Sequence, residues 1–179
     1  MEIVKIPIER IHILKGEADS TLKMLEQKLN LSINAEPDGS VELSGEPVDE
    51  FFAKGVIKAI GRGFEPVPAL KLLDEEYGLN VVDLRDFAKN PDAMTRIKGR
   101  VIGEKGKAKR IIEEEGEVDV AIYGHTVGII GKLELLAIAT TAVFKLAEGQ
   151  PHAAVYLYLE KNRRRRKEEE LKNRGGIWK

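Results

Sequence analysis

The sequence predicts an α+β fold made of two tandem copies of one structural unit. Read along the chain, each half gives a strand, a helix, a glycine-containing turn, a second helix, two more strands and a third helix. The glycine turns begin at Gly16 and Gly103, which are offset by 87 residues. Gly45 and Gly131, which end the second strands of the two hairpins, are offset by 86. A repeated order at a nearly fixed offset indicates a duplicated fold.

The first unit covers residues 1–65. Leu22, Leu25 and Leu29 have the spacing i, i+3, i+7 that marks one apolar face of a helix. The sequence Pro37-Asp38-Gly39 is typical of a turn between two short strands. The predicted elements are an apolar strand and helix over residues 3–14, a helix over 22–29, strands over 31–35 and 41–43, and a helix over 48–60.

The second unit covers residues 80–160. Its turn, Gly103-Glu104-Lys105-Gly106, opens a helix whose apolar face carries Ala108, Ile111 and Ile112. Gly124-His125 is predicted to turn a hairpin. The predicted elements are a strand over residues 81–84, a helical segment over 94–102, a helix after 106, strands over 118–123 and 126–130, a helix over 133–147 and a short helix over 151–160.

Two segments fall outside these units. Residues 66–79 contain Pro66 and Pro68 and are predicted to form a linker. Residues 161–179 begin with a basic cluster and contain Gly175-Gly176 near their end. We expect them to form a basic, mobile C-terminal tail.

The composition excludes several kinds of chemistry. The chain of 179 residues has no cysteine, which excludes disulfides, thiolate nucleophiles and cysteine-ligated zinc. His12, His125 and His152 have no metal-ligand spacing, so we expect neither a metal nor a cofactor. No apolar run approaches the roughly 18 residues of a membrane span. The first ten residues also lack the apolar centre of a signal peptide, so we expect a cytoplasmic protein without membrane contact.

Positive charge surrounds the turn at 103–106, although the formal net charge of the whole chain is −1. Between Arg96 and Arg110 the only acid is Glu104, which leaves roughly +6. Glycine lets a ligand backbone approach closely, and the N-terminus of the next helix favours phosphate. A solvated charged face is the alternative, but charges around a glycine turn favour phosphate binding. The predicted contacts are Arg96, Lys98, Arg100, Gly103, Glu104, Lys105, Gly106, Lys107, Lys109 and Arg110.

The turn of the first unit, Gly16-Glu17-Ala18-Asp19, departs from this pattern. Asp19 stands where the last glycine would be, and the charges from Glu9 to Lys23 sum to zero. An aspartate repels phosphate, and its Cβ would crowd a nucleic-acid backbone. We therefore expect a degenerate copy that serves as a scaffold or as a protein-binding surface.

The segment from Gly99 to Ile112, with Val101-Ile102-Gly103-Glu104-Lys105-Gly106 at its centre, resembles the eukaryotic-type (type I) KH-domain family. The resemblance implies two tandem KH domains, each a three-stranded antiparallel sheet packed on helices. It also implies that the GxxG turn clamps about four nucleotides of a single strand, with the bases in an apolar groove. The groove candidates are Ile102, Ile112, Val120 and Ile122, for which an ordinary role in the core is an equal alternative.

One family combines a degenerate first KH domain with an intact second one. It is the Partner of Nob family of archaeal and eukaryotic pre-ribosomal factors, with a Krr-type relative. The chain is similar to archaeal members in the stretches 100–106, 122–127 and 148–152, although the last two also fit a hairpin turn and a helix restart. The resemblance implies binding near the 3′ end of small-subunit rRNA, within the pre-ribosomal small subunit, and assistance to the trimming endonuclease of the Nob type.

Alternatives stay open at the C-terminus and for the function. The cluster Arg163, Arg164, Arg165 and Arg166 either contacts phosphate or pairs with Glu168-Glu169-Glu170 on a helix. Trp178 can stack on a base. The P-loop and dinucleotide patterns fail, and contiguous acids do not make an acid–base pair, so we expect no enzyme. A noncatalytic RNA-binding factor is the leading hypothesis, ahead of a protein-interaction scaffold with incidental RNA contact and of a nuclease or nuclease subunit.

Overall fold

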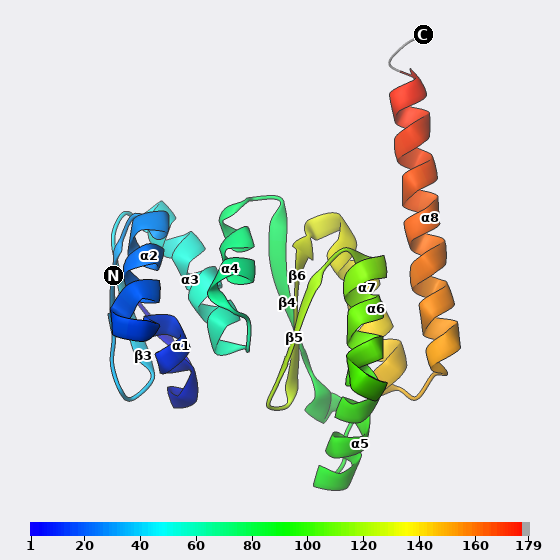
Figure 1. Cartoon of the computed structure of the whole chain (residues 1–179), viewed down its shortest axis with the longest axis horizontal. Helices are drawn as coiled ribbons and strands as arrows, with labels where there is room; N and C mark the ends of the chain where they lie inside the picture. Colours follow the sequence, from blue (N-terminus) through cyan, green and yellow to red (C-terminus); the bar gives the residue numbers. More distant parts are fainter. Residues whose placement is uncertain (177–179) are drawn as a thin grey trace.

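The chain folds into two three-stranded antiparallel sheets, each packed on helices, as the computed structural model of residues 1–176 shows (Figure 1). The strand order is β1-β3-β2 in the first sheet and β4-β6-β5 in the second, so the third strand of each unit lies in the middle of its sheet. This arrangement confirms the predicted α+β class.

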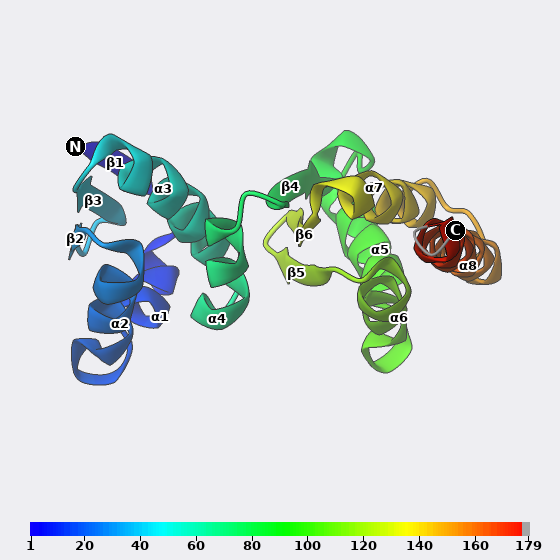
Figure 2. The ribbon, with the colours of Figure 1, turned by 90° about the horizontal axis from the view of Figure 1, so that it is seen from above.

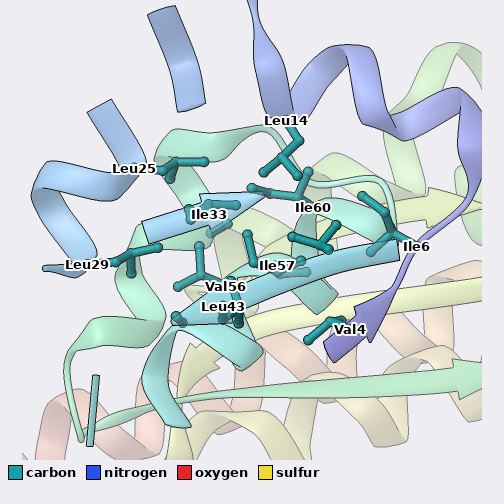
Figure 3. Close-up of a cluster of buried hydrophobic side chains, with 14 of the residues drawn as sticks. Val4, Ile6, Leu14, Leu25, Leu29, Ile33, Leu43, Val56, Ile57 and Ile60 are labelled. Carbon is teal, nitrogen blue, oxygen red and sulfur yellow. The ribbon is translucent and has the colours of Figure 1, made fainter. Parts of the chain in front are cut away.

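The first unit follows the predicted order of elements. Val41 and Leu43 of the central strand are fully buried and contact the third helix through Val56, Ile57 and Ile60 (Figure 3). Apolar residues at every second strand position therefore form one side of this core. The elements are β1 (Glu2–Lys5), η1 (Ile8–Arg10), α1 (Ile11–Lys15), η2 (Glu17–Asp19), α2 (Ser20–Leu29), β2 (Ser32–Ala35), β3 (Ser40–Ser44) and α3 (Pro47–Gly61).

The second unit repeats this order and adds a long C-terminal helix. Its core joins the three strands to helices on one face through residues such as Val101, Ile112 and Val143. The elements are β4 (Tyr77–Asp83), η4 (Leu84–Asp86), α5 (Pro91–Ile102), η5 (Glu104–Gly106), α6 (Lys107–Gly116), β5 (Asp119–Tyr123), β6 (Thr126–Lys132), α7 (Leu133–Ala147) and α8 (His152–Gly176).

The repeat extends to single hydrogen bonds. The N–H of Ile33 donates to Glu26 Oε1 at 2.8 Å, and 87 residues later the N–H of Val120 donates to Glu113 Oε1 at 3.1 Å. A Cβ added to Gly45 would lie 2.7 Å from Leu31, and one added to Gly131 would lie 2.6 Å from Val118. The two halves therefore share local packing as well as the order of their elements.

The two units pack directly against each other, with α3 and α4 (Pro66–Ala69) between the sheets (Figures 1 and 2). Ala121 and Ile130 of the second sheet belong to the core of the first unit. Phe64 lies against Gly128, where an added Cβ would come 2.7 Å from the ring. β6 is buried on both faces for this reason, which explains its six consecutive buried residues.

Polar contacts of Arg10 also stabilise the junction between the two units. Arg10 Nε donates to the carbonyl of Ile60 at 2.8 Å, and its Nη2 donates to the carbonyl of Phe64 at 2.7 Å. The Arg10 guanidinium also lies 5.8 Å from the ring centroid of Tyr123, whose hydroxyl donates to Glu9. Burial, followed by this hydrogen bond, raises the pKa of Tyr123, so the phenol stays protonated at neutral pH.

Two predicted segments differ from the structure. The helix expected over 151–160 continues as α8 to Gly176, because Arg163 and Arg166 pair with acids of α6 and the sequence beyond is rich in Arg, Lys and Glu, which favour helix. The expected linker over 66–79 is structured: α4 leads into η3 (Leu70–Leu73), and β4 already begins at Tyr77. Trp178 lies outside the described residues.

None of the helices described within residues 1–176 has both the length and the apolar character needed to cross a membrane.

Candidate nucleic-acid interface

The turn between α5 and α6 contains three residues with positive φ angles. Gly103 has φ 76° and ψ 171°, Lys105 has φ 53° and Gly106 has φ 75°. At Gly103 a Cβ would lie 2.5 Å from the backbone nitrogen of Ala108. Gly103 is therefore required for the two helices to meet as closely as they do.

Gly106 has a different role. Among the described residues, nothing lies within 4 Å of the position that its Cβ would occupy. Its positive φ is also no bar to other residues, because Asp19 adopts φ 59° at the corresponding place in the first unit. Gly106 therefore leaves open space on the outside of the turn, beside the N-terminus of α6, which no side-chain hydrogen bond caps within residues 1–176.

Most of the predicted basic residues are accessible on the turn and on the two helices that flank it. Arg96, Lys105, Lys107 and Arg110 are exposed, and Lys98 is half-buried. Arg110 Nη2 donates to the carbonyl of Lys105 at 3.2 Å, which supports the turn from the following helix. Lys109 Nζ lies 3.5 Å from Glu113 on the same helix, a partly exposed pair that water screens.

Arg100 faces away from this group. Its Nε donates to the carbonyl of Leu146 at 2.9 Å, and its Nη2 donates to the carbonyl of Gln150. These carbonyls belong to the end of α7 and the segment after it, so Arg100 caps a helix C-terminus. The His152 Nε2 atom lies 2.9 Å from the carbonyl of Arg100. In this structure Arg100 therefore supports the end of α7, which differs from the phosphate contact expected for it.

The groove candidates divide into two pairs. Ile112 is fully buried and Val120 is 4% exposed, so both pack in the hydrophobic core of the second unit. Their side chains complete the hydrophobic core under α6. The periodicity of the sequence identifies apolar positions but does not tell a core residue from a residue that lines a groove. Ile102 and Ile122 are partly exposed and lie next to this core.

Glu113 was missed by the sequence reasoning, which treated it as one of three contiguous acids. Its Oε1 accepts the N–H of Val120 at 3.1 Å and so ties α6 to β5, the two elements beside the partly exposed Ile122. Glu26 makes the matching bond in the first unit. The shared offset of 87 residues was the signal that could have identified this pair.

Three of the four arginines of α8 pair with acids other than those expected, and the fourth donates to an asparagine. Arg163 Nη1 lies 3.4 Å from Glu115 and Arg166 Nη1 lies 2.8 Å from Glu117, both at the end of α6. Arg164 pairs with Glu160 at 2.8 Å, and Arg165 donates to Asn162. Pairing with the glutamates at 168–170 is therefore not what holds the cluster, and two of its members bind α8 to α6.

The first turn has the same backbone shape as the second. Gly16 has φ 70° and ψ −176°, and Ala18 and Asp19 have φ 50° and 59°. What separates the two turns is therefore the side chains. The first carries an acid at its last position and lacks a lysine in the middle, and it repeats the geometry without the positive charge.

The part of the chain that the structure describes holds no group of three or more His, Asp or Glu side chains placed to bind a metal ion.

Two helices joined by a glycine turn and packed on a three-stranded antiparallel sheet define a KH domain, and residues 78–164 match the model of the second KH domain of PNO1, a eukaryotic type KH-domain (KH-domain type I). A KH domain-containing protein of Methanocaldococcus jannaschii is 39% identical over 170 residues, 92% of this chain and 75% of that protein. The chain belongs to the Dim2/PNO1 family of KH-domain proteins, which confirms the resemblance found in the sequence.

Two further relatives bear on function. Dim2p of Pyrococcus horikoshii, whose structure was solved in a complex with a/eIF2alpha and rRNA, is 39% identical over 91% of this chain and 93% of its own, with a TM-score of 0.84. The pre-rRNA-processing protein pno1 of Aspergillus fumigatus is 34% identical over 116 residues. This chain spans 46% of the length of that fungal protein.

Proposed function

We propose that this protein is a noncatalytic single-stranded RNA-binding factor that binds near the 3′ end of small-subunit rRNA and assists its maturation in the cytoplasm. In this proposal both units are KH domains, and the first is degenerate. The supporting observation is the turn at 103–106, where open space at Gly106, an uncapped helix N-terminus and exposed basic side chains coincide.

Each part of the turn has a physical role in RNA binding. The open space at Gly106 admits an RNA backbone, and the N–H groups at the start of α6 donate to its phosphates. Lys105 and Lys107 supply charge from the turn itself, and Arg96, Lys98, Lys109 and Arg110 supply it from the flanking helices. Ile102 and Ile122 offer apolar contact to the bases.

The relatives support the choice of RNA. The Pyrococcus protein was solved with rRNA, and the Aspergillus protein is a pre-rRNA-processing protein. We extend both properties to this chain, which matches the Pyrococcus protein over nearly its full length. The pre-ribosomal small subunit and an rRNA-trimming endonuclease of the Nob type are the proposed partners.

A protein-binding role for the first unit is the second candidate. The Pyrococcus structure includes a/eIF2alpha as well as rRNA. In this chain Val48 and Phe51, at the start of α3, are 66% and 72% exposed, which is unusual for large apolar side chains in one place. The neutral turn at 16–19 agrees with a unit that does not bind phosphate.

The clamp can be tested with the double substitution Glu104→Asp and Lys105→Asp. Two acids in the turn oppose phosphate, and we expect the affinity for a single-stranded rRNA 3′-end oligonucleotide to fall at least about tenfold, or about 1.4 kcal/mol. Fluorescence anisotropy measures the affinity, and circular dichroism checks the fold.

The repeat supplies a matched control. Glu17→Asp with Ala18→Asp introduces the same pair of acids into the first turn, and we expect an affinity within about threefold of the unchanged protein. Equal affinities for all three proteins would remove the clamp assignment. RNA cleavage by the purified protein would contradict the noncatalytic role.

A further inference from the structure

A second group of basic side chains lies at the junction of the two units. The end of β1, the end of α3, and β4 with the turn before β6 enclose a cavity of about 400 Å³ there. We call it the junction pocket and define it by Lys5, Lys58, Arg62, Asp83, Arg85 and His125. β4 and β5 are the two edge strands of the second sheet, so the pocket lies at the opposite edge of this sheet from Ile122.

Three cations of the junction pocket have no ion-pair or hydrogen-bond partner among the described residues. Lys5, Lys58 and Arg62 form neither an ion pair nor a side-chain hydrogen bond with any of residues 1–176. They line one cavity from the end of β1 and the end of α3, and no ion pair among the described residues reduces their mutual repulsion. An anion in the cavity would offset it.

The one carboxylate of the pocket is already occupied. Arg85 Nη2 donates to Asp83 Oδ2 at 2.6 Å, and the Arg85 backbone N–H donates to Oδ1 at 2.9 Å. His125 Nδ1 lies 3.2 Å from the same Oδ1. The Arg85 hydrogen bonds hold the pKa of Asp83 well below its usual range, so this carboxylate is charged and its charge is balanced. It also fixes Arg85 at the wall of the cavity.

The frame of the pocket is rigid. Lys58 and Arg62 are four residues apart at the end of α3 and therefore lie on one side of it. Beneath them, a Cβ added to Gly61 would lie 2.6 Å from Ile6, so the residue that follows β1 packs on α3 more closely than a side chain at position 61 would allow. The three unpaired cations are therefore presented by elements that do not need to be ordered by a ligand.

We propose that the junction pocket binds a phosphate group, supplied by the backbone of an RNA segment other than the one in the clamp at 103–106. Arg62 offers a planar, two-pronged donor suited to phosphate oxygens, and Lys5 and Lys58 add point charge. Arg85, whose Nε and Nη2 donate to Asp83, adds positive charge at the wall of the cavity. A cavity of about 400 Å³ has room for a phosphate with its sugar, and within the described residues its lining contains no Phe, Tyr or Trp ring. RNA as the source of the phosphate rests on the proposed function, whereas the anion site itself does not.

The first test uses inorganic phosphate as the probe. Amide resonances of the full chain are followed by NMR during titration at constant ionic strength, with chloride as the exchanged anion. We expect saturable shifts at Arg62, Arg85 and Thr126, and we expect Lys58→Ala with Arg62→Ala to abolish the saturation. Shifts that stay linear in phosphate, or that polyglutamate at equal charge reproduces, would overturn a phosphate site.

The second test identifies the source of the phosphate. Two RNAs are compared, the single-stranded 3′-end oligonucleotide and the same oligonucleotide joined to a hairpin duplex. We expect Lys58→Ala with Arg62→Ala to weaken binding of the longer RNA about tenfold and to leave the shorter RNA within twofold. The salt dependence for the longer RNA should decrease by about two phosphate contacts.

The control variant removes the same number of positive charges at two other positions, one on α3 and one on η3. Lys54→Ala with Lys71→Ala deletes two lysines that pair with Glu2 and Asp119, and we expect both affinities to stay within twofold. An unchanged affinity of the pocket variant for the longer RNA would overturn RNA as the source, even if inorganic phosphate binds. The clamp variant at 104 and 105 weakens both RNAs, so failure of the clamp and failure of the junction pocket give different results.

Discussion

At the scale of single residues, the two glycines of the second turn serve different purposes. The fold needs Gly103, because a side chain there would meet the backbone of Ala108 at 2.5 Å. Gly16 has the same need in the first unit, where a Cβ would lie 2.1 Å from Thr21 Oγ1. The fold does not need a glycine at 106, since Asp19 fills that place in the first turn. The difference assigns Gly103 to structure and Gly106 to ligand approach.

This division predicts losses of stability of different size for two alanine substitutions. Gly106→Ala puts a Cβ into open space at positive φ and should lower the free energy of unfolding by about 1 kcal/mol. Gly103→Ala adds a clash with backbone and should lower it by at least about 3 kcal/mol. Urea denaturation measures both values.

RNA affinity is the second measurement that distinguishes the roles of Gly103 and Gly106. The folded Gly106→Ala protein should bind the 3′-end oligonucleotide about tenfold more weakly, because its Cβ occupies the space for the RNA backbone. Equal stability losses for the two variants, or full RNA affinity in Gly106→Ala, would contradict the assignment.

At the scale of elements, α6 is held at both ends. Its N-terminus faces the turn at 103–106, and its C-terminus is tied to β5 by Glu113 and to α8 by Arg163 and Arg166. Arg166 Nη2 also donates to the carbonyl of Glu115 at 3.3 Å, near the negative end of the helix dipole. Arg163 and Arg166 therefore stabilise the position of α6, the helix whose N-terminus forms part of the clamp.

We expect two of the four arginines of α8 to contribute to stability and the other two to contribute little to it. Arg163 and Arg166 are half-buried against α6, so Arg163→Ala with Arg166→Ala should lower the free energy of unfolding by about 1–2 kcal/mol. Arg164 and Arg165 are exposed, so Arg164→Ala with Arg165→Ala should change stability by less than about 0.5 kcal/mol.

RNA binding gives the second readout for this pair of variants. If the tail contacts phosphate, Arg164→Ala with Arg165→Ala should reduce the salt dependence of RNA binding by about two contacts, with the fold intact. A salt dependence equal to that of the unchanged protein would limit the whole cluster to holding α8 in place. Thermal unfolding and a salt titration of anisotropy supply the two measurements.

At the scale of the whole molecule, the sequence predicts the repeated features well and the contacts between repeats poorly. Periodicity and the offset of 87 residues predict the units, the turns and most helices, because these depend on local spacing. Periodicity does not separate a groove residue from a core residue, as Ile112 shows. It also gives no sign that Arg100 turns towards the end of α7, since that depends on the distant Leu146 and Gln150.

The junction between the two units is a second feature that the sequence pattern does not predict. Gly128, Ala121 and Ile130 look like ordinary strand residues, and only the approach of Phe64 explains why β6 is buried on both faces. The end of the linker and the start of β4 were misplaced for the same reason. Tyr77 and Gly78 pair with Lys132 and Gly131, far along the chain, and carry no local strand pattern.

The junction also determines how the molecule unfolds. Since Ala121 and Ile130 belong to the core of the first unit, we expect the two units to unfold together in one transition. Phe64→Ala leaves a cavity between the sheets and should lower the free energy of unfolding by about 3–5 kcal/mol. It should also separate the transition into two, because the shared core is what couples the units. Differential scanning calorimetry, with hydrogen exchange of β3 and β6 amides, follows each unit. Two transitions already present in the unchanged protein would show that the junction does not couple the units, and the junction pocket would then lack its rigid frame.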